Sequence, residues 1–184
     1  MRTFQTLRLL LAGLAWMATS AGWAQSKSPP DYEVKAAFLA NFPKYVEWSA
    51  EAPADTNSPT VVACLGESKV SEALRKVIQS RPPNAGAIVA KVITAEAESA
   101  DCHILFIGGA ERRRLPAVLA RLKGASVLVV GESDDFLDKG GTINLALRDR
   151  RVRVEVNLHA ARQANLIINS KLLGVADVVK GKAN

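Results

Sequence analysis

The chain has 184 residues and a formal net charge of +6 at neutral pH, because 24 lysines and arginines stand against 18 aspartates and glutamates. With 48% hydrophobic residues and no low-complexity tract, this composition excludes an intrinsically disordered or fibrous protein. The basic excess is mild, and it favours contact with an anionic membrane surface or an acidic partner, or serves solubility alone.

Residues 1–24 have the pattern of an export signal. Arg2 and Arg8 flank the start, residues 9–18 are almost wholly apolar, and small residues precede the expected cleavage point. The apolar run of about 10 residues is half the length of about 20 that a spanning helix needs; an uncleaved anchor is the alternative. We therefore expect cleavage after residue 24 and a single domain over residues 25–184. An exported protein of this kind is not expected to bind nucleic acid.

Residues 31–48 are expected to form an amphipathic helix that covers the sheet. Asp31 is the predicted N-cap, and Pro43 predicts a kink or a fresh turn because proline removes a helical hydrogen bond. Apolar residues recur at the spacing of one helical face, at Val34, Ala37, Phe38, Phe42 and Tyr45.

The segment that follows alternates between apolar runs and amphipathic helices. Helical stripes lie over residues 70–78 and 115–122, the first preceded by Ser68 as a predicted N-cap. Alternating strands and helices imply parallel pairing through right-handed crossovers. Short apolar runs predict buried strands over residues 60–65, 87–94, 102–108 and 126–132.

The C-terminal part changes pattern. Residues 142–147 and 152–158 alternate between apolar and polar side chains, which predicts an antiparallel hairpin. A short helix over 159–164, an apolar link over 166–168 and a helix over 170–179 complete the prediction. The predicted fold class is α/β: a mostly parallel open sheet with flavodoxin-like or Rossmann-like layering, helices on both faces and a C-terminal antiparallel hairpin added to the sheet.

The sequence contains no recognisable catalytic or metal-binding motif. The dinucleotide fingerprint is missing after the first predicted strand, where Gly66 is followed by Glu67 and Ser68. His103 and His159 are the only histidines, and neither has the spacing of a metal ligand set. No G-x-S-x-G nucleophile elbow is present. We therefore expect no enzyme activity, no cofactor and no metal.

The two cysteines, Cys64 and Cys102, allow two interpretations. Export to an oxidising compartment would let the pair form a disulfide. Each cysteine lies in an apolar run where bridging geometry is demanding, so two buried free thiols are the alternative. Their wide separation excludes C-x-x-C chemistry.

Basic residues collect at residues 112–114 and 148–153. Charge runs of this kind usually form a solvated surface. The second run has the greater potential for function, because its arginines can make bidentate contacts with carboxylates or phosphates.

Several segments, in their order along the chain, resemble the YfiR-like proteins of the bacterial periplasm. These are YEVKAAFLANFPKYVEW, CHILFIG, VLVVGE, FLDKGGTINLAL and RVEVNLHAARQANLIINSKLLGVADVV. The resemblance covers nearly the whole chain after residue 24. The sequence departs from the family pattern at Pro43, where a helix-forming residue is usual, and at Ser49, where proline commonly follows the tryptophan.

The resemblance implies a small periplasmic α/β protein without catalytic activity. Named members repress a membrane-bound diguanylate cyclase by holding its periplasmic sensing domain, so that release raises cyclic di-GMP and favours biofilm formation. The resemblance also implies redox sensitivity, because Cys64 and Cys102 match a cysteine pair of relatives. A second pair found in some relatives is missing, with Leu137 and Asn144 in that region.

We therefore expect the partner to be the sensor domain of an inner-membrane diguanylate cyclase. An outer-membrane lipoprotein and a second copy of the chain are further candidate partners. The hairpin and the segment after it are the expected contact surface, with the polar residues Arg151, Arg153, Glu155, Asn157, Asn169 and Lys171.

The alternative function is a small-ligand binder that serves a sensor kinase or transporter. Parallel sheets hold ligands at the carboxyl ends of their strands. Gly66, Gly108 and Glu132 are predicted to lie near those ends.

Overall fold

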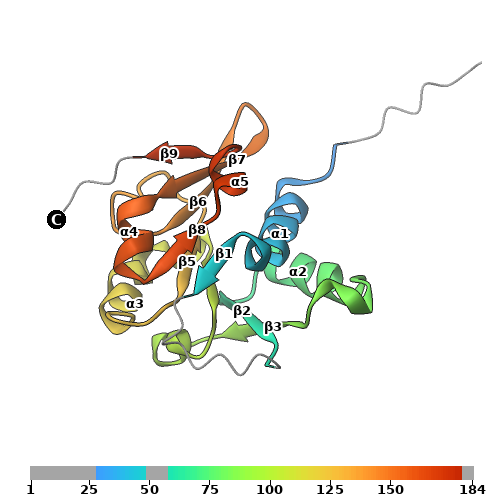
Figure 1. Cartoon of the computed structure of the whole chain (residues 1–184), viewed down its shortest axis with the longest axis horizontal. Coiled ribbons are helices and arrows are strands. Elements are labelled where there is room, and N and C mark those ends of the chain that lie inside the picture. The colour runs from blue at the N-terminus through green and yellow to red at the C-terminus, as the bar shows by residue number, and fades with distance from the viewer. Residues whose placement is uncertain (1–27, 49–57, 180–184) are drawn as a thin grey trace, which may run out of the picture.

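The computed structural model describes residues 28–48 and 58–179 (Figure 1). The predicted export signal, residues 1–24, lies outside these described residues. Within them, no helix combines the length and the apolar character needed to cross a membrane.

A seven-stranded sheet forms the centre of the fold, in the order β3-β2-β4-β5-β6-β7-β9. The strands from β3 to β6 pair in parallel, β6 and β7 form an antiparallel hairpin, and β9 pairs in parallel with β7. The predicted α/β class with its added hairpin is confirmed. The strands are β2 (Thr60–Leu65), β3 (Ile88–Ile93), β4 (Ile104–Ile107), β5 (Leu128–Gly131), β6 (Ile143–Arg148), β7 (Arg151–Asn157) and β9 (Asp177–Val179).

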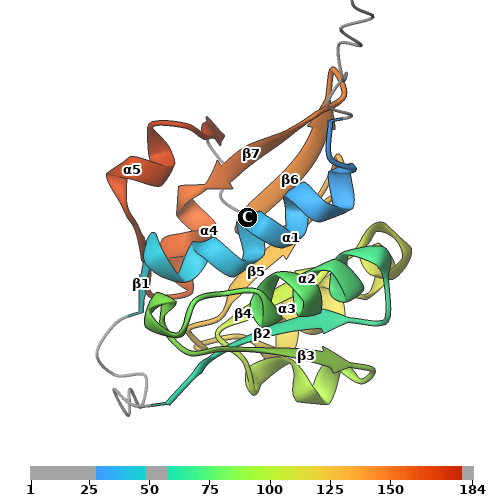
Figure 2. The same ribbon diagram turned by 90° about the vertical axis from the view of Figure 1, so that its right-hand side faces the viewer.

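Helices cover both faces of this sheet, as Figure 2 shows. Because side chains alternate along a strand, β2 sends Val62 and Cys64 to one core and Ala63 and Leu65 to the other. The first core packs against α1 (Asp31–Asn41) and α2 (Lys69–Gln79), and the second against α3 (Leu115–Arg121). Burial on both faces explains why the parallel strands have continuous apolar sequences.

Helix α2 forms where its capping signal predicted it. Ser68 accepts a hydrogen bond from the amide of Ser71, while the Ser71 hydroxyl accepts one from the amide of Ser68. Val70 and Leu74 are buried on the inner face. The prediction of this helix and its N-cap is confirmed.

Helix α1 differs from its prediction in three ways. Its N-cap is Pro30 and not Asp31, and the helix stops at Asn41, where the 3-10 turn Phe42–Lys44 contains Pro43 and confirms the predicted fresh turn. The chain beyond the turn is strand β1 (Val46–Trp48). Its buried face consists of Lys35, Ala36, Leu39 and Ala40. Of the predicted face, only Phe42 is fully buried, while Val34, Ala37, Phe38 and Tyr45 are half-buried.

The predicted C-terminal helix over residues 170–179 is also wrong. Helix α5 (Ser170–Leu173) has a single turn, and the chain then becomes strand β9 beside β7. The apolar link is strand β8 (Leu166–Ile168), which pairs antiparallel with β1. The short helix before it is confirmed as α4 (Leu158–Gln163). The remaining elements are the 3-10 turns η1 (Phe42–Lys44), η2 (Pro83–Ala85), η3 (Glu96–Ala100) and η4 (Gly109–Arg114).

Candidate functional site

In parallel sheets, ligands bind at the carboxyl ends of the strands. From β2 the chain first adds β3 on one side of the sheet and then β4 on the other side. The crevice expected in such folds would therefore lie between the carboxyl ends of β2 and β4. Gly66 follows β2, Gly108 follows β4, and Glu132 follows β5. The three residues proposed for a ligand crevice therefore do lie at one edge.

This edge is occupied by the protein's own charged groups. The Oε1 atom of Glu132 accepts a hydrogen bond of 2.8 Å from the amide of Gly109, at the start of η4. Its Oε2 atom lies 2.7 Å from the ammonium of Lys35, which also contacts Asp31 at 2.9 Å. Burial lowers the pKa of Lys35, but its bonds to Glu132 and Asp31 outweigh burial and raise the pKa above its ordinary value.

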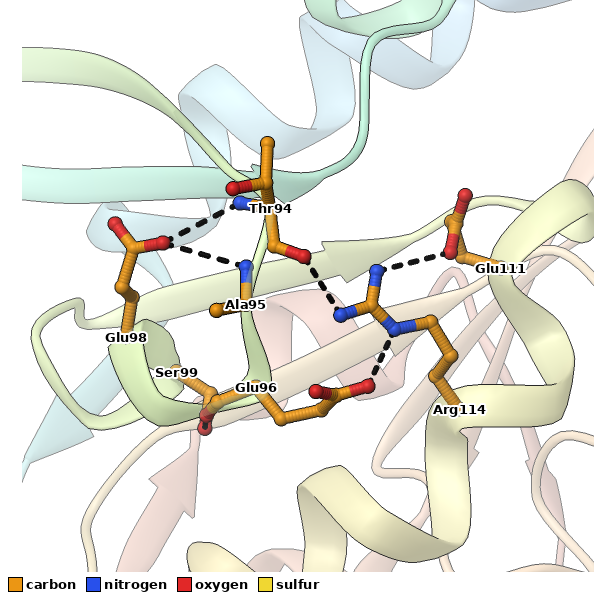
Figure 3. Close-up of polar contacts among 7 residues, drawn as sticks. All are labelled: Thr94, Ala95, Glu96, Glu98, Ser99, Glu111 and Arg114. Atoms are coloured by element: carbon orange, nitrogen blue, oxygen red, sulfur yellow. Dashed lines mark hydrogen bonds and ion pairs between the residues drawn. The ribbon is translucent and has the colours of Figure 1, made fainter.

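A second set of ion pairs joins η4 to the end of β3 (Figure 3). The Arg114 guanidinium donates to Glu96 at 2.5 Å, to Glu111 at 3.2 Å and to the carbonyl of Thr94 at 2.7 Å. The bond from Arg114 holds the pKa of Glu96 at about 2. Arg114 thus belongs to an internal network, although the sequence indicated a solvated basic run.

These contacts argue against a ligand crevice at the carboxyl edge. The Glu132 carboxylate takes the Gly109 amide that an anion would need, and the Glu111 side chain lies against Gly66 at the end of β2. Within residues 28–48 and 58–179, no group of three or more His, Cys, Asp or Glu side chains is arranged to hold a metal ion.

The β6–β7 hairpin displays the exposed basic residues that the sequence predicted. Arg151 and Arg153 are both exposed at its outer end, and Figure 1 shows that this end projects from the body. Glu155 is half-buried and accepts hydrogen bonds from Asn144 at 2.8 Å and Arg148 at 3.4 Å. Arg148 also contacts Asp134 at 2.7 Å. Glu155 therefore organises the polar face of the hairpin.

The remaining predicted contact residues do not join this surface. Asn157 is 3% exposed, and its side chain accepts from the amide of Ala160 and donates to the carbonyl of Leu137. Asn169 caps α5 through the amide of Lys171. Lys171 is exposed on α5, which Figure 2 shows at the other end of β7 from the hairpin tip. The expected single surface is thus wrong for Asn157, and Lys171 belongs to a separate region.

We expect Asn157→Ala to destabilise the protein by about 1–3 kcal/mol, because it removes the α4 cap and leaves buried backbone groups unpaired. Arg151→Ala, at an exposed position, should change stability by less than about 0.5 kcal/mol. Urea denaturation of the two variants provides the measurement. Equal stabilities would show that the Asn157 contacts contribute nothing.

The outward side of α1 forms an apolar groove with α5 that the sequence analysis missed. The groove has a volume of about 520 Å³, and Phe38, Phe42, Tyr45 and Val175 contribute to its lining. Val175 is 76% exposed. The aromatic spacing that predicted a core face therefore marks, in part, a surface groove.

The family described as YfiR/HmsC-like matches residues 32–177, which is most of the chain. The chain belongs to the YfiR/HmsC-like family. At the level of the family, this membership supports a periplasmic regulator of diguanylate cyclase signalling and not a catalyst. No curated protein sequence matches the chain.

Two solved structures resemble this YfiR/HmsC-like protein in fold. One is the ABC domain in complex with L-Trp from Streptococcus pneumonia, with a TM-score of 0.53, 11% identity and coverage of 78% of this chain. The other is a conserved domain protein from Vibrio cholerae O1 biovar El Tor, with a TM-score of 0.51, 10% identity and coverage of 77%. This chain covers 60% of each of those chains. At such low identities the likeness shows the fold alone.

The two cysteines of this YfiR/HmsC-like protein are free and buried in the structure. Cys64 belongs to the core beneath α1 and α2, whereas Cys102 belongs to the core on the α3 side of the sheet. The expected disulfide is absent because the two thiols belong to the cores on opposite faces of the sheet. Burial raises the pKa of each thiol to about 12.

We expect neither thiol to react with Ellman's reagent in the native protein at pH 8, because the reactive thiolate is scarce so far below a pKa of about 12. After unfolding in guanidinium chloride without reductant, two thiols per chain should react. A count of zero in the unfolded protein would establish the disulfide instead.

His103 is a second group whose titration the fold controls. Its Nδ1 atom accepts a hydrogen bond of 3.1 Å from the amide of Val61, and its ring packs edge-on against Trp48. Burial lowers the pKa of His103 below its ordinary value of about 6.5. The folded protein therefore favours the neutral ring, which alone can accept this bond.

The His103 contribution to stability should be complete above about pH 6.5 and should decline as the pH falls through the lowered pKa of the folded protein. Relative to a His103→Gln variant, the wild type should lose about 0.5–1.5 kcal/mol more between pH 7.5 and pH 5, the net value of one hydrogen bond. Thermal unfolding at both pH values measures this. Parallel losses in the two proteins would contradict the assignment.

Proposed function

We propose that this protein represses an inner-membrane diguanylate cyclase by sequestering the sensor domain of that cyclase in the periplasm. The proposal takes residues 1–24 as a cleaved export signal and residues 25–184 as the mature domain. Repression would lower cyclic di-GMP and biofilm formation. The observation that carries the proposal is membership of the YfiR/HmsC-like family over residues 32–177.

Two features of the structure support a binding role. The hairpin projects from the body and exposes Arg151 and Arg153, which suit an acidic partner surface. The carboxyl edge of the sheet, where a ligand-binding relative would hold its ligand, is filled by the pairs of Glu132 and Arg114. These contacts favour the regulatory function over the small-ligand alternative.

A test combines binding with a cellular readout. The mature protein, immobilised, should capture a membrane protein with a diguanylate cyclase domain from detergent-solubilised membranes of the source organism. Deletion of the gene should raise cyclic di-GMP. Recovery of no cyclase together with unchanged cyclic di-GMP would refute the proposal. The same experiment would reveal an outer-membrane lipoprotein as a further partner, and light scattering would reveal a homodimer.

Charge reversal connects this function to the hairpin. The double variant Arg151→Glu/Arg153→Glu should bind the captured cyclase at least tenfold more weakly, because like charges would then face the partner. The matched control is Arg113→Glu/Arg121→Glu, which makes the same charge change at exposed positions on η4 and α3. Equal weakening in both variants would show a general charge effect and no role for the hairpin.

A further inference from the structure

Strand β7 is only partly covered along one of its two edges. On one side it pairs with β6 from Arg151 to Val156, which is all but its last residue. On the other side β9 pairs only with the last part of β7, from Glu155 to Asn157. The first four residues of β7, residues 151–154, therefore have no strand beside them within the described part of the chain.

The register of the hairpin shows which backbone groups this leaves open. Asn157 donates its amide to Thr142 across the β6–β7 ladder, and residues that bond across an antiparallel ladder alternate with residues that point away. Every second residue before Asn157, namely Glu155, Arg153 and Arg151, therefore forms its backbone hydrogen bonds with β6. Val152 and Val154 direct their backbone groups away from β6. The register that places Asp177 beside Glu155 pairs the Val154 carbonyl with the amide of Asp177. Among described residues, the amide and carbonyl of Val152 and the amide of Val154 remain open.

The side chains along this open edge carry a strong positive charge. Arg151 and Arg153 point to one face of the hairpin, spaced by about 7 Å as second neighbours on a strand. Neither has a carboxylate within ion-pair distance among the residues described, and the same holds for Arg150 in the turn. On the opposite face, Leu147 is 51% exposed and lies beside Val152.

We propose that the open edge of β7 at residues 151–154 binds an extended acidic segment of a partner protein by strand addition. The segment would occupy the position next to β7 that β9 leaves empty. Its backbone would pair with the amide and carbonyl of Val152 and with the amide of Val154, and alternate acidic side chains would meet Arg151 and Arg153. This inference rests on the proposed function in taking the segment from the sequestered partner.

The backbone groups are the reason to prefer a polypeptide over a lipid surface. Anionic phospholipids could contact the arginines, but only another extended chain offers donors and acceptors at the repeat of Val152 and Val154. A different explanation is that the arginines merely protect an exposed edge against aggregation, a common use of charge at sheet edges. That explanation predicts no selective binding.

The test uses the full mature protein and a blocked eight-residue peptide with alternating glutamate and valine. Titration by fluorescence anisotropy should show binding, and the equivalent lysine–valine peptide should bind at least tenfold more weakly. Arg151→Glu/Arg153→Glu should weaken the acidic peptide at least tenfold, whereas Arg113→Glu/Arg121→Glu should change its affinity less than threefold. Amide exchange by NMR should show at least tenfold protection of Val152 and Val154 at saturation.

Each negative result would overturn the inference in a recognisable way. Equal binding of both peptides, or no binding, would leave the arginines as protection of the edge. Binding without protection of Val152 and Val154 would show charge attraction and no strand addition. Binding to vesicles of phosphatidylglycerol without binding to the peptide would identify a lipid surface. Because no cyclase is present in this experiment, any of these results would leave the capture test of the proposed function unaffected.

Discussion

Gly141→Ala is expected to destabilise the protein by about 3 kcal/mol, at the upper end of typical overpacking costs. A Cβ atom on Gly141 would lie 2.1 Å from a ring carbon of Phe136, and one on Gly131 would lie 2.2 Å from another. Phe136 is 1% exposed and cannot move aside without disturbing the core on the α3 side. Gly131→Ala should therefore have a similar effect, read as a fall of about 6–12 °C in melting temperature.

If a clash with the Phe136 ring causes the loss of stability, substitutions at Phe136 and Gly141 should be energetically coupled. Phe136→Ala alone should cost about 3–5 kcal/mol through the cavity it leaves. In the double variant Phe136→Ala/Gly141→Ala, the new methyl group enters that space, so the combined cost should fall short of the sum by at least about 1 kcal/mol. Gly174→Ala, with its nearest atom at 3.4 Å, is the mild control. Strict additivity would contradict this account.

The parts of the fold that could be predicted are those set by local sequence. Continuous apolar runs identified β2, β4 and β5 because strands buried on both faces require them. Ser68 located the start of α2 because the cap is a contact within the same segment. The alternation of the hairpin likewise gave β6 and β7.

The errors arose where distant contacts decide the structure. The segment after α5 has helical spacing, yet its three residues Asp177–Val179 become a strand because the edge of β7 is available for pairing. Trp48 was read as the end of a helix, but its segment pairs with β8, far along the chain. The inner face of α1 was only partly predicted, because the close approach of α2 places Ala36 and Ala40 in the interior and leaves Phe38 half-buried.

The candidate site shows the same division. Exposure of Arg151 and Arg153 followed from their alternation with valines in the hairpin. The structural role of Asn157 could not be predicted, because the carbonyl of Leu137 reaches it only through the fold. The open edge of β7 could not be predicted from the sequence either, because it depends on where β9 begins.

Lys35 is the residue whose importance the sequence concealed most, and Lys35→Met should cost about 2–4 kcal/mol. Lys35 is 6% exposed, although it lies outside the apolar face that the sequence predicts for this helix. Without its ammonium, the Glu132 carboxylate would remain largely buried with only the Gly109 amide as a partner. Removing one member of a fully buried pair costs about 3–5 kcal/mol, and the partial exposure of Glu132 reduces this.

The pH dependence should follow the same pair. Because contacts raise the pKa of Lys35, its contribution to stability is complete at neutral pH and is lost only as the pH rises through that raised value. The bond from Lys35 lowers the pKa of Asp31, so this carboxylate stabilises the fold at neutral pH and ceases to do so as the pH falls through its lowered value. Lys35→Met should therefore flatten the stability profile at both ends of the pH range.

A double-mutant cycle separates the pair from the helix that carries it. Glu132→Gln retains an acceptor for Gly109 but removes the charge, so its combination with Lys35→Met should cost less than the sum by at least about 1 kcal/mol. Lys139→Met is the matched control, because Lys139 pairs with Asp135 at an exposed site and should contribute less than about 1 kcal/mol. If Lys35→Met and Lys139→Met lower the free energy of unfolding equally, apolar packing alone holds α1 to the sheet and the Lys35–Glu132 pair adds no stability.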